Sequence, residues 1–258
     1  MVGLESFIAT YGMGAAIGAA VAMAAGGFAK GVVGFALPLI GVSLAGSFVP
    51  FDVAVALLIV PMLVSNLVQA LRHGVGPALE SASRFREMLL VLAVMIALSA
   101  QLVVLLPERL LFGLLGAVVV LFAASQLVGW QPRFPAHHRR LVEAAVAFVA
   151  GILGGVSGIW GPPLVMYLIT LNLSKTEMVR VQSLMFLVGS VVLFFAHLHS
   201  GVLDATTLPA SAWMTLPAML AMFVGYQVHD RLDQAVFRKA TLAVLLLTGL
   251  NLLRRSML

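Results

Sequence analysis

A single lysine lies among glycines in an otherwise apolar stretch near the start of the chain. Lys30 is followed by Gly31 and Gly34, and the apolar residues around it include no carboxylate. An isolated charge in apolar surroundings is costly unless it meets a counter-charge, water or a bound ion. We therefore expect Lys30 to pair with an anionic ligand. The alternative is that its long side chain extends to a water interface.

The glycine pattern around Lys30 occurs again later in the chain, at the same spacing and without a gap. Matched hydrophobic segments broken by glycine are typical of transporters built from internal repeats, with the substrate site at the breaks. The pattern therefore predicts two structural halves and one central site. The matched positions are Gly27 with Gly154, Gly31 with Gly158, Gly34 with Gly161, and Lys30 with Ser157.

The expected site uses backbone groups as well as side chains. Helices that begin after Gly34 and after Gly161 would present free amide hydrogens and a partial positive charge to an anion. The Ser157 hydroxyl would donate a further hydrogen bond, and Asn66 and Gln182 lie on the helix that follows the break in each half. Two alternatives remain open: close helix packing for the glycines, and hydrogen bonds to neighbouring helices for the amides. The predicted substrate-binding residues are Lys30, Gly31, Gly34, Ser157, Gly158, Gly161, Asn66 and Gln182.

The composition is that of an integral membrane protein. Hydrophobic residues make up 62% of the 258, charged residues only 10%, and the mean hydropathy is +1.10. These values lie outside the range of soluble globular proteins. The chain has no cysteine, which excludes disulfides and thiol chemistry. We expect a lipid bilayer around the protein, and no cofactor or metal. No nucleic-acid partner is expected either, because the basic residues lie in short loops between apolar segments.

The apolar segments divide equally between two halves. The second segment of each half has about 13–15 residues, too few to cross the roughly 30 Å hydrocarbon core. We therefore expect an all-α polytopic membrane protein with two inverted-topology repeats, each a broken or re-entrant helical hairpin plus three transmembrane helices. The predicted domains are residues 1–130 and 141–258 as the repeats, and 131–140 as a cytoplasmic linker. The segments lie at about 8–29, 33–47, 53–71, 88–106 and 110–129, then at about 141–157, 160–172, 178–199, 209–228 and 236–253.

Loop charges predict the orientation of the chain. Most of the 15 lysines and arginines fall in one set of alternate loops, which the positive-inside rule makes cytoplasmic. Both termini are then expected outside the cell membrane, and no cleaved signal peptide is expected. An odd number of crossings in each half gives the repeats opposite orientations, so the glycine breaks should approach each other within the membrane. The cytoplasmic set is Arg72, Arg84, Arg86, Arg133, Arg139, Arg140, Lys175, Arg180, Arg231, Arg238 and Lys239, and the outer set is Arg109, Arg254 and Arg255.

The two glycine-rich elements resemble those of a known family. The first runs Gly27-x-x-x-Gly31-x-x-Gly34-x-x-x-Pro38-Leu39, and the second runs from Gly154 to Leu164 and contains Pro162-Pro163. Both are similar to elements of the TauE/SafE sulfite exporter family of membrane permeases. The resemblance covers nearly the whole chain, and it implies transport of sulfite, a sulfonate or a related small organic or sulfur oxyanion.

We therefore expect a small-anion permease that works by alternating access around the two breaks, and not an enzyme. The lack of carboxylates in the middle of the apolar segments favours anions over cations. A coupling proton or cation and a homo-oligomer are left open. The alternative function is a rhomboid-like intramembrane serine protease, because Gly155-Val156-Ser157-Gly158 matches the Gly-x-Ser-Gly motif and His197 or His199 would act as the base.

Overall fold

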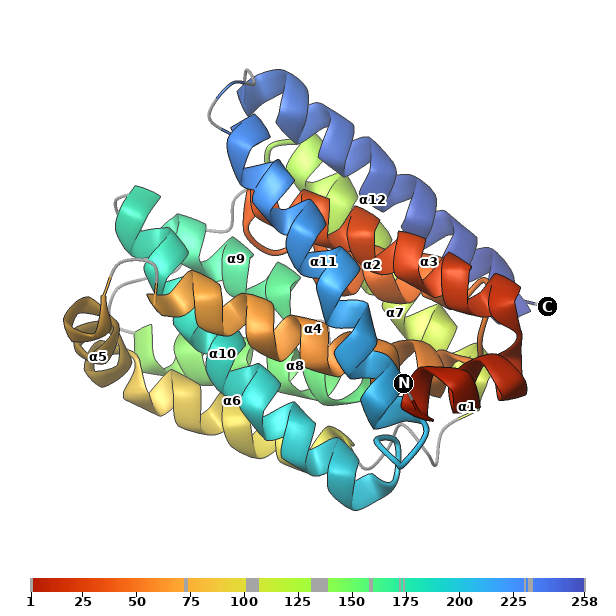
Figure 1. Cartoon of the computed structure of the whole chain (residues 1–258). Helices are drawn as coiled ribbons and strands as arrows, with labels where there is room; N and C mark the ends of the chain where they lie inside the picture. The colour runs from red at the N-terminus through yellow and green to blue at the C-terminus, as the bar shows by residue number, and fades with distance from the viewer. Residues whose placement is uncertain are drawn as a thin grey trace.

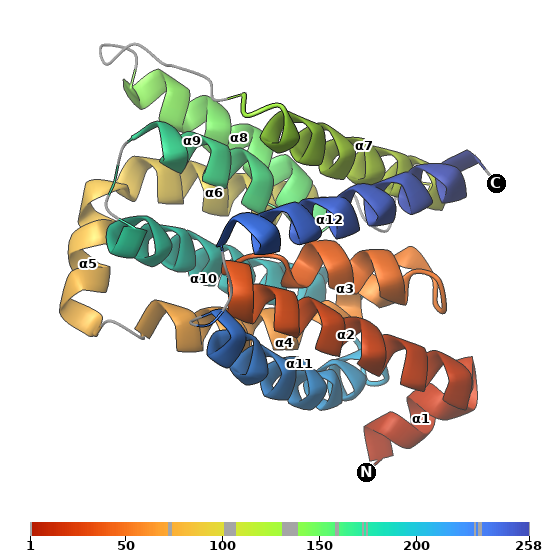
Figure 2. The ribbon, with the colours of Figure 1, turned by 90° about the horizontal axis from the view of Figure 1, so that it is seen from above.

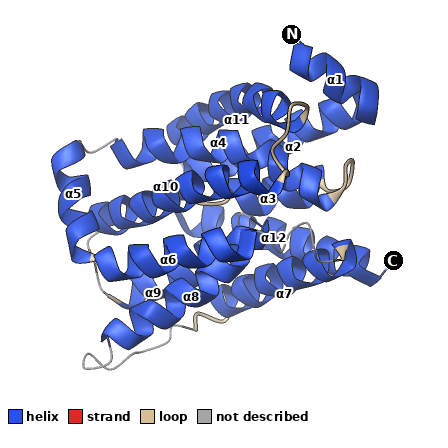
Figure 3. Cartoon of the chain, turned by 90° about the horizontal axis from the view of Figure 1, so that it is seen from below, coloured by secondary structure: helices blue, strands red, loops and turns tan. Residues whose placement is uncertain are grey.

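The computed structural model describes residues 2–71, 74–100, 107–130, 139–157, 160–171, 173, 175–229, 231 and 234–257. Among these residues all the regular structure is helical, as Figure 3 shows. The helices are α1 Val2–Tyr11, α2 Met13–Val33, α3 Leu37–Ala45, α4 Phe51–Leu71, α5 Val75–Arg84, α6 Arg86–Ser99, α7 Glu108–Leu127, α8 Arg139–Ser157, α9 Gly161–Thr170, α10 Lys175–Ser200, α11 Thr207–His229 and α12 Gln234–Met257.

Four helices of the described chain are long and apolar enough to cross a membrane. They are α2, α4, α10 and α11, and their spanning stretches contain 20 to 22 residues. At about 1.5 Å per residue, such a stretch matches the roughly 30 Å thickness of a hydrocarbon core. The prediction of an all-α polytopic membrane protein is therefore confirmed.

Each predicted apolar segment corresponds to one helix of the structure. Two further helices, α1 and α5, were not predicted. The segment expected at 8–29 is divided at Gly12, whose φ of +88° ends α1 and starts α2 in a new direction. The other addition is α5, which follows Gly74, also at positive φ. This helix is short and contains polar residues, so the sequence has no apolar run there that would predict a membrane segment.

Helix α8 begins at Arg139, within the last two residues of the predicted linker 131–140. Its first turn contains an ion pair, in which Arg139 Nε lies 2.9 Å from Glu143 Oε1 four residues later. The remaining part of the linker, 131–138, lies outside the described residues.

The two short helices α3 and α9 follow the glycine breaks. They contain 9 and 10 residues and are therefore about 14–15 Å long, half of what a membrane crossing requires. Gly34 ends α2 at φ +91°, a left-handed conformation that strongly favours glycine. Proline in the first turn of α3 and of α9 costs nothing, because no amide hydrogen is needed there.

The longer helices form a row in which each packs on the next. The order is α2, α11, α4, α10, α6, α8, with α4 and α10 in the middle (Figure 2). A further pair, α7 and α12, packs together, with α12 beside α3 and α7 beside α9. The helices correspond between the halves as α2 with α8, α3 with α9, α4 with α10, α6 with α11 and α7 with α12. When each helix is exchanged for its counterpart, the order of the row is reversed and the same helices remain packed together. Figure 1 shows the same arrangement from the side.

Glycines allow close contact at both ends of this row. A Cβ atom on Gly27 of α2 would lie 2.1 Å from the Ala218 carbonyl oxygen of α11, and one on Gly31 would lie 2.2 Å from the Met222 oxygen. In the second half, a Cβ on Gly155 of α8 would lie 2.6 Å from the carbonyl oxygen of Ile96 in α6. These glycines therefore serve helix packing, the alternative that the sequence left open.

One end of the molecule gathers basic residues from both halves. Arg84 pairs with Glu177 of α10 at 2.5 Å, and Arg180 Nε donates to Ser81 Oγ of α5 at 3.2 Å. Arg84 and Arg139 both contact the buried ring of Phe85, at 5.4 and 5.6 Å from its centroid. We call this the arginine end, defined by Arg84, Arg139 and Arg180. The two termini lie at the opposite end (Figures 1 and 2).

Candidate functional site

Lys30 lies in the last turn of α2, in the centre of the protein. Its side chain is only 1% exposed, and its Nζ donates a hydrogen bond to Asn66 Oδ1. The ammonium also lies 5.8 Å from the centroid of the Phe186 ring. The carbonyl end of a helix carries a partial negative charge, so α2 stabilises this cation in part. Snorkelling to an interface is excluded by the burial.

Asn66 connects Lys30 to the second half of the chain. Its Nδ2 donates to the Phe186 carbonyl oxygen at 3.0 Å and lies 3.4 Å from Ser190 Oγ, both on α10. Because the amide nitrogen is held by α10, the amide oxygen points to Lys30. One asparagine thus links α2, α4 and α10 across the middle of the row.

The second helix break faces the first across a small cavity. A Cβ on Gly161, the first residue of α9, would lie 3.4 Å from Phe186 and 3.7 Å from Phe35, which directly follows Gly34. The cavity has a volume of about 10 Å³, room for one water molecule. This volume is too small for an oxyanion. The lining residues are Lys30, Phe35, Pro38, Leu39, Met62, Asn66, Trp160, Gly161 and Phe186.

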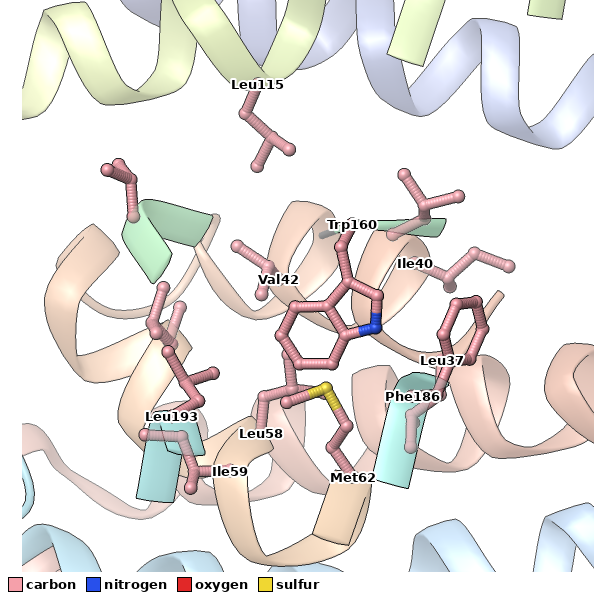
Figure 4. Close-up of a cluster of buried hydrophobic side chains, with 14 of the residues drawn as sticks. Leu37, Ile40, Val42, Leu58, Ile59, Met62, Leu115, Trp160, Phe186 and Leu193 are labelled. Carbon is pink, nitrogen blue, oxygen red and sulfur yellow. The ribbon is translucent and has the colours of Figure 1, made fainter. Parts of the chain in front are cut away.

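Trp160 fills the space beside this cavity. Figure 4 shows its indole ring surrounded by Met62, Leu58 and Phe186, and the rings of Trp160 and Phe186 meet edge to face with centroids 6.2 Å apart. Glycine makes room for the indole on both sides, since a Cβ on Gly154 or Gly189 would lie within 3.0 Å of it. The side chain is 2% exposed and acts as packing around the site.

The glycines of the first break do not supply the expected amide donors. The Gly34 N–H donates to the Lys30 carbonyl oxygen at 2.7 Å, and the Gly34 carbonyl accepts from Gln69 Nε2 at 3.1 Å. Gly31 lies within α2 and faces α11. Both positions shape the break and the packing, because the helix end consumes its own polar groups.

The remaining predicted site residues lie at different distances from the cavity. Gln182 is buried on α10, one turn before Phe186, and does not line the cavity. Ser157 is the last residue of α8, and Gly158 lies outside the described residues. His197 is fully buried with its Nδ1 3.3 Å from Ser200 Oγ, whereas His199 is exposed.

Several functional candidates were missed by sequence reasoning. Phe186, Met62 and Phe35 line the cavity, but apolar residues in an apolar chain give no signal of their own. Gln69 binds the first break and was not among the predicted site residues, although it is a polar residue in an apolar segment, one turn after Asn66.

The charges around the cavity are one-sided. Within the described part of the chain, the ion pairs Arg84–Glu177, Arg139–Glu143 and Arg140–Glu87 lie away from Lys30, and no carboxylate lines the cavity. The side-chain hydrogen bond with Glu143 raises the pKa of Arg139. The Glu143 carboxylate is therefore paired with Arg139 and not with Lys30. The Glu143 carboxylate also accepts from the Tyr167 hydroxyl at 2.9 Å.

A polytopic helical fold with a buried lysine between two helix breaks is typical of a membrane transport protein. Residues 18–252 match the family model described as sulfite exporter TauE/SafE, and the chain belongs to this family of membrane transporters. Membership implies export of sulfite or related sulfur anions and supports a transporter rather than a protease. No match to the chain was found among curated proteins or among solved structures.

Proposed function

We propose that the protein is a permease for a small oxyanion, sulfite or a related sulfonate or organic anion, with its central site at Lys30. The observation that carries this proposal is the state of Lys30. It is buried, and its hydrogen-bond partner is the neutral amide of Asn66 rather than a carboxylate. Because a buried charge without a counter-ion costs several kcal/mol, an anionic substrate would relieve this cost.

The proposed mechanism is alternating access around the two helix breaks. The repeats 1–130 and 141–258 insert with opposite orientation, a geometry supported by the packed pairs that remain unchanged when the halves are exchanged. The cavity of about 10 Å³ is a closed state, so the helices around Phe35 and Gly161 separate when an anion enters. Lys30 supplies charge, Asn66 orients it, and the amide end of α9 adds a partial positive charge.

The proposed location is the cell membrane, with the arginine end in the cytoplasm. The basic loops around Arg84, Arg139 and Arg180 lie together at this end, which supports a common side for them. Both termini would then lie outside.

A binding screen tests the substrate class. Purified protein is heated with sulfite, sulfate, thiosulfate, sulfonates or small carboxylates, and the unfolding temperature is recorded. A ligand at about 100 times its Kd stabilises the folded state by about 2.7 kcal/mol, enough for a clear shift. Stabilisation by sulfur oxyanions supports the proposal, and stabilisation by cations alone would contradict it.

Lys30 variants test the site. Lys30→Met keeps the length of the side chain and removes its charge, so we expect anion affinity and flux in proteoliposomes to fall by about tenfold or more, as for a lost charged hydrogen bond. The control is Arg231→Met, which removes one exposed charge away from the cavity. Normal flux with Lys30→Met would overturn the assignment.

A further inference from the structure

Two buried glutamines near the central site have unsatisfied amide atoms. Gln69 on α4 and Gln182 on α10 are each 4% exposed. Gln69 Oε1 and Gln182 Nε2 are buried without a hydrogen-bond partner among the described residues. A buried polar atom without a hydrogen-bond partner destabilises the fold, so such atoms call for a ligand or water.

Both glutamines lie on the same side of the central site. The contact between Arg180 and Ser81 places the start of α10 beside α5, which follows the end of α4, so α4 and α10 run antiparallel. Gln69 is three residues beyond Asn66, about 4.5 Å along α4, and Gln182 is four residues before Phe186, about 6 Å along α10. Each step leads toward the arginine end.

The two helices also contact each other at this level. Asn66 of α4 bonds to α10 through Phe186, and Gln69 and Gln182 lie within one turn of these two residues on their helices. In Figure 2 the ends of α4 and α10 next to α5 are at the same end of the molecule. Along their helices, Gln69 and Gln182 thus lie between the level of Asn66 and Phe186 and the arginine end.

We propose that Gln69 and Gln182 form a second anion position, through which the substrate passes between Lys30 and the arginine end. This inference rests on the proposed function. The available atoms are one acceptor and one donor, which suits a singly protonated oxyanion: its O–H donates to Gln69 Oε1, and its charged oxygens accept from Gln182 Nε2. The cations Arg84, Arg139 and Arg180 attract the same ion at the mouth.

A comparison of binding and flux tests the second position. Gln69→Leu and Gln182→Leu should reduce sulfite flux about tenfold, in line with the loss of one hydrogen bond to a charged group. Sulfite affinity at the Lys30 site, followed by the sulfite-dependent shift in unfolding temperature, should stay within about twofold in Gln182→Leu, since this side chain does not line the cavity. Gln69→Leu also removes the hydrogen bond to the Gly34 carbonyl, so it is compared by flux alone. Gln182→Asn, which keeps the amide, should recover part of the flux. The matched control is Gln227→Leu, at an exposed position of α11.

The outcomes separate this inference from the proposed function. Normal flux in both glutamine variants, with sulfite binding lost in Lys30→Met, would overturn the second position alone. Equal losses of affinity and flux in Gln182→Leu would also overturn it, because they would assign Gln182 to the central site. Normal sulfite binding and flux in Lys30→Met would overturn both proposals.

Cysteine labelling tests the direction of the path. The chain has no cysteine, so Gln69→Cys and Gln182→Cys each introduce a single thiol. A membrane-impermeant thiol reagent should modify both when added at the arginine end. Labelling from the opposite side only, or from neither side, would overturn the proposed path.

Discussion

At the scale of residues, the central feature is a lysine held by an amide. Asn66 accepts from Lys30 and donates to the Phe186 carbonyl, so its orientation is fixed by α10. An amide oxygen satisfies the hydrogen bond of an ammonium without neutralising its charge. The proposed site therefore offers the charge of protonated Lys30 to an anion.

This reasoning predicts the effect of Asn66→Asp. A carboxylate at position 66 would form an ion pair with Lys30, so the anion would lose its binding partner. We expect the sulfite-dependent shift in unfolding temperature to disappear. Without ligand, the gain from the ion pair is offset by the loss of the hydrogen bond from Asn66 Nδ2 to the Phe186 carbonyl. Thermal unfolding with and without sulfite measures both, and a retained shift would show that the charge of Lys30 does not bind the anion.

At the scale of elements, helix ends and glycine contacts determine where the helices lie. The start of α11 has a complete capping box: Asp204 Oδ1 accepts from the Thr207 amide at 2.7 Å, and Thr207 Oγ1 accepts from the Asp204 amide at 2.9 Å. This cap holds the turn between α10 and α11, the helices on either side of α4.

The cap makes a pH-dependent contribution to stability. The hydrogen bond from the Thr207 backbone is the main cause that lowers the pKa of Asp204, so the contribution is complete above the unfolded pKa and is lost as the pH falls through the folded value. Asp204→Ala should cost about 0.5–2 kcal/mol at neutral pH. Asp204→Asn should be less sensitive than wild type to acid below about pH 4. Unfolding temperatures across this range measure both effects, and identical acid profiles would contradict the role of the cap.

The contact of α2 with α11 predicts opposite results for two glycines of one helix. A Cβ at Gly27 would overlap the Ala218 carbonyl, whereas a Cβ at Gly14 meets nothing within 4 Å. Gly27→Ala should therefore destabilise the fold by about 1–3 kcal/mol. Gly14→Ala should leave stability unchanged or slightly raised, because alanine favours helix. Unfolding temperature and detergent-extracted yield measure both variants, and equal behaviour would contradict the packing role of Gly27.

At the scale of the whole molecule, helices of the two halves alternate along the row, so each neighbouring pair in the row joins the two halves. Asn66 and α10 connect them at the centre, and Phe85 with Arg84, Arg139 and Glu177 connects them at the arginine end. The central connection surrounds the cavity, and the other closes one end of the row. Because both connections join the two halves of the chain, the proposed alternating access must rearrange them.

The orientation of the molecule is the prediction at this scale. Both termini lie at the end opposite the arginines (Figure 1). A reporter enzyme that is active only outside the cytoplasm should therefore be active when it is fused to either terminus. A reporter enzyme that is active only in the cytoplasm should be active when it is inserted between residues 131 and 138. Termini on opposite sides of the membrane would contradict the fold. Two cytoplasmic termini would contradict the proposed orientation, because the arginine end would then lie outside.

The sequence by itself determined the class, the positions of the breaks and the buried cation. Runs of apolar residues, the glycine at 34, the glycine and prolines at 161–163, and Lys30 are local features, and local features set helix length and helix ends. The helix α5 escaped because it is too polar and too short to give an apolar run.

Only the tertiary structure decided which residues meet. It directed Gly27 and Gly31 against α11, used the amide of Gly34 within its own helix end, and paired Lys30 with Asn66. It also put Gln182 one turn outside the cavity. The physical reason is that these contacts join residues far apart in the chain, and they depend on how helix surfaces fit together. Helical periodicity limits which face of a helix is buried, but it does not say which neighbour covers that face.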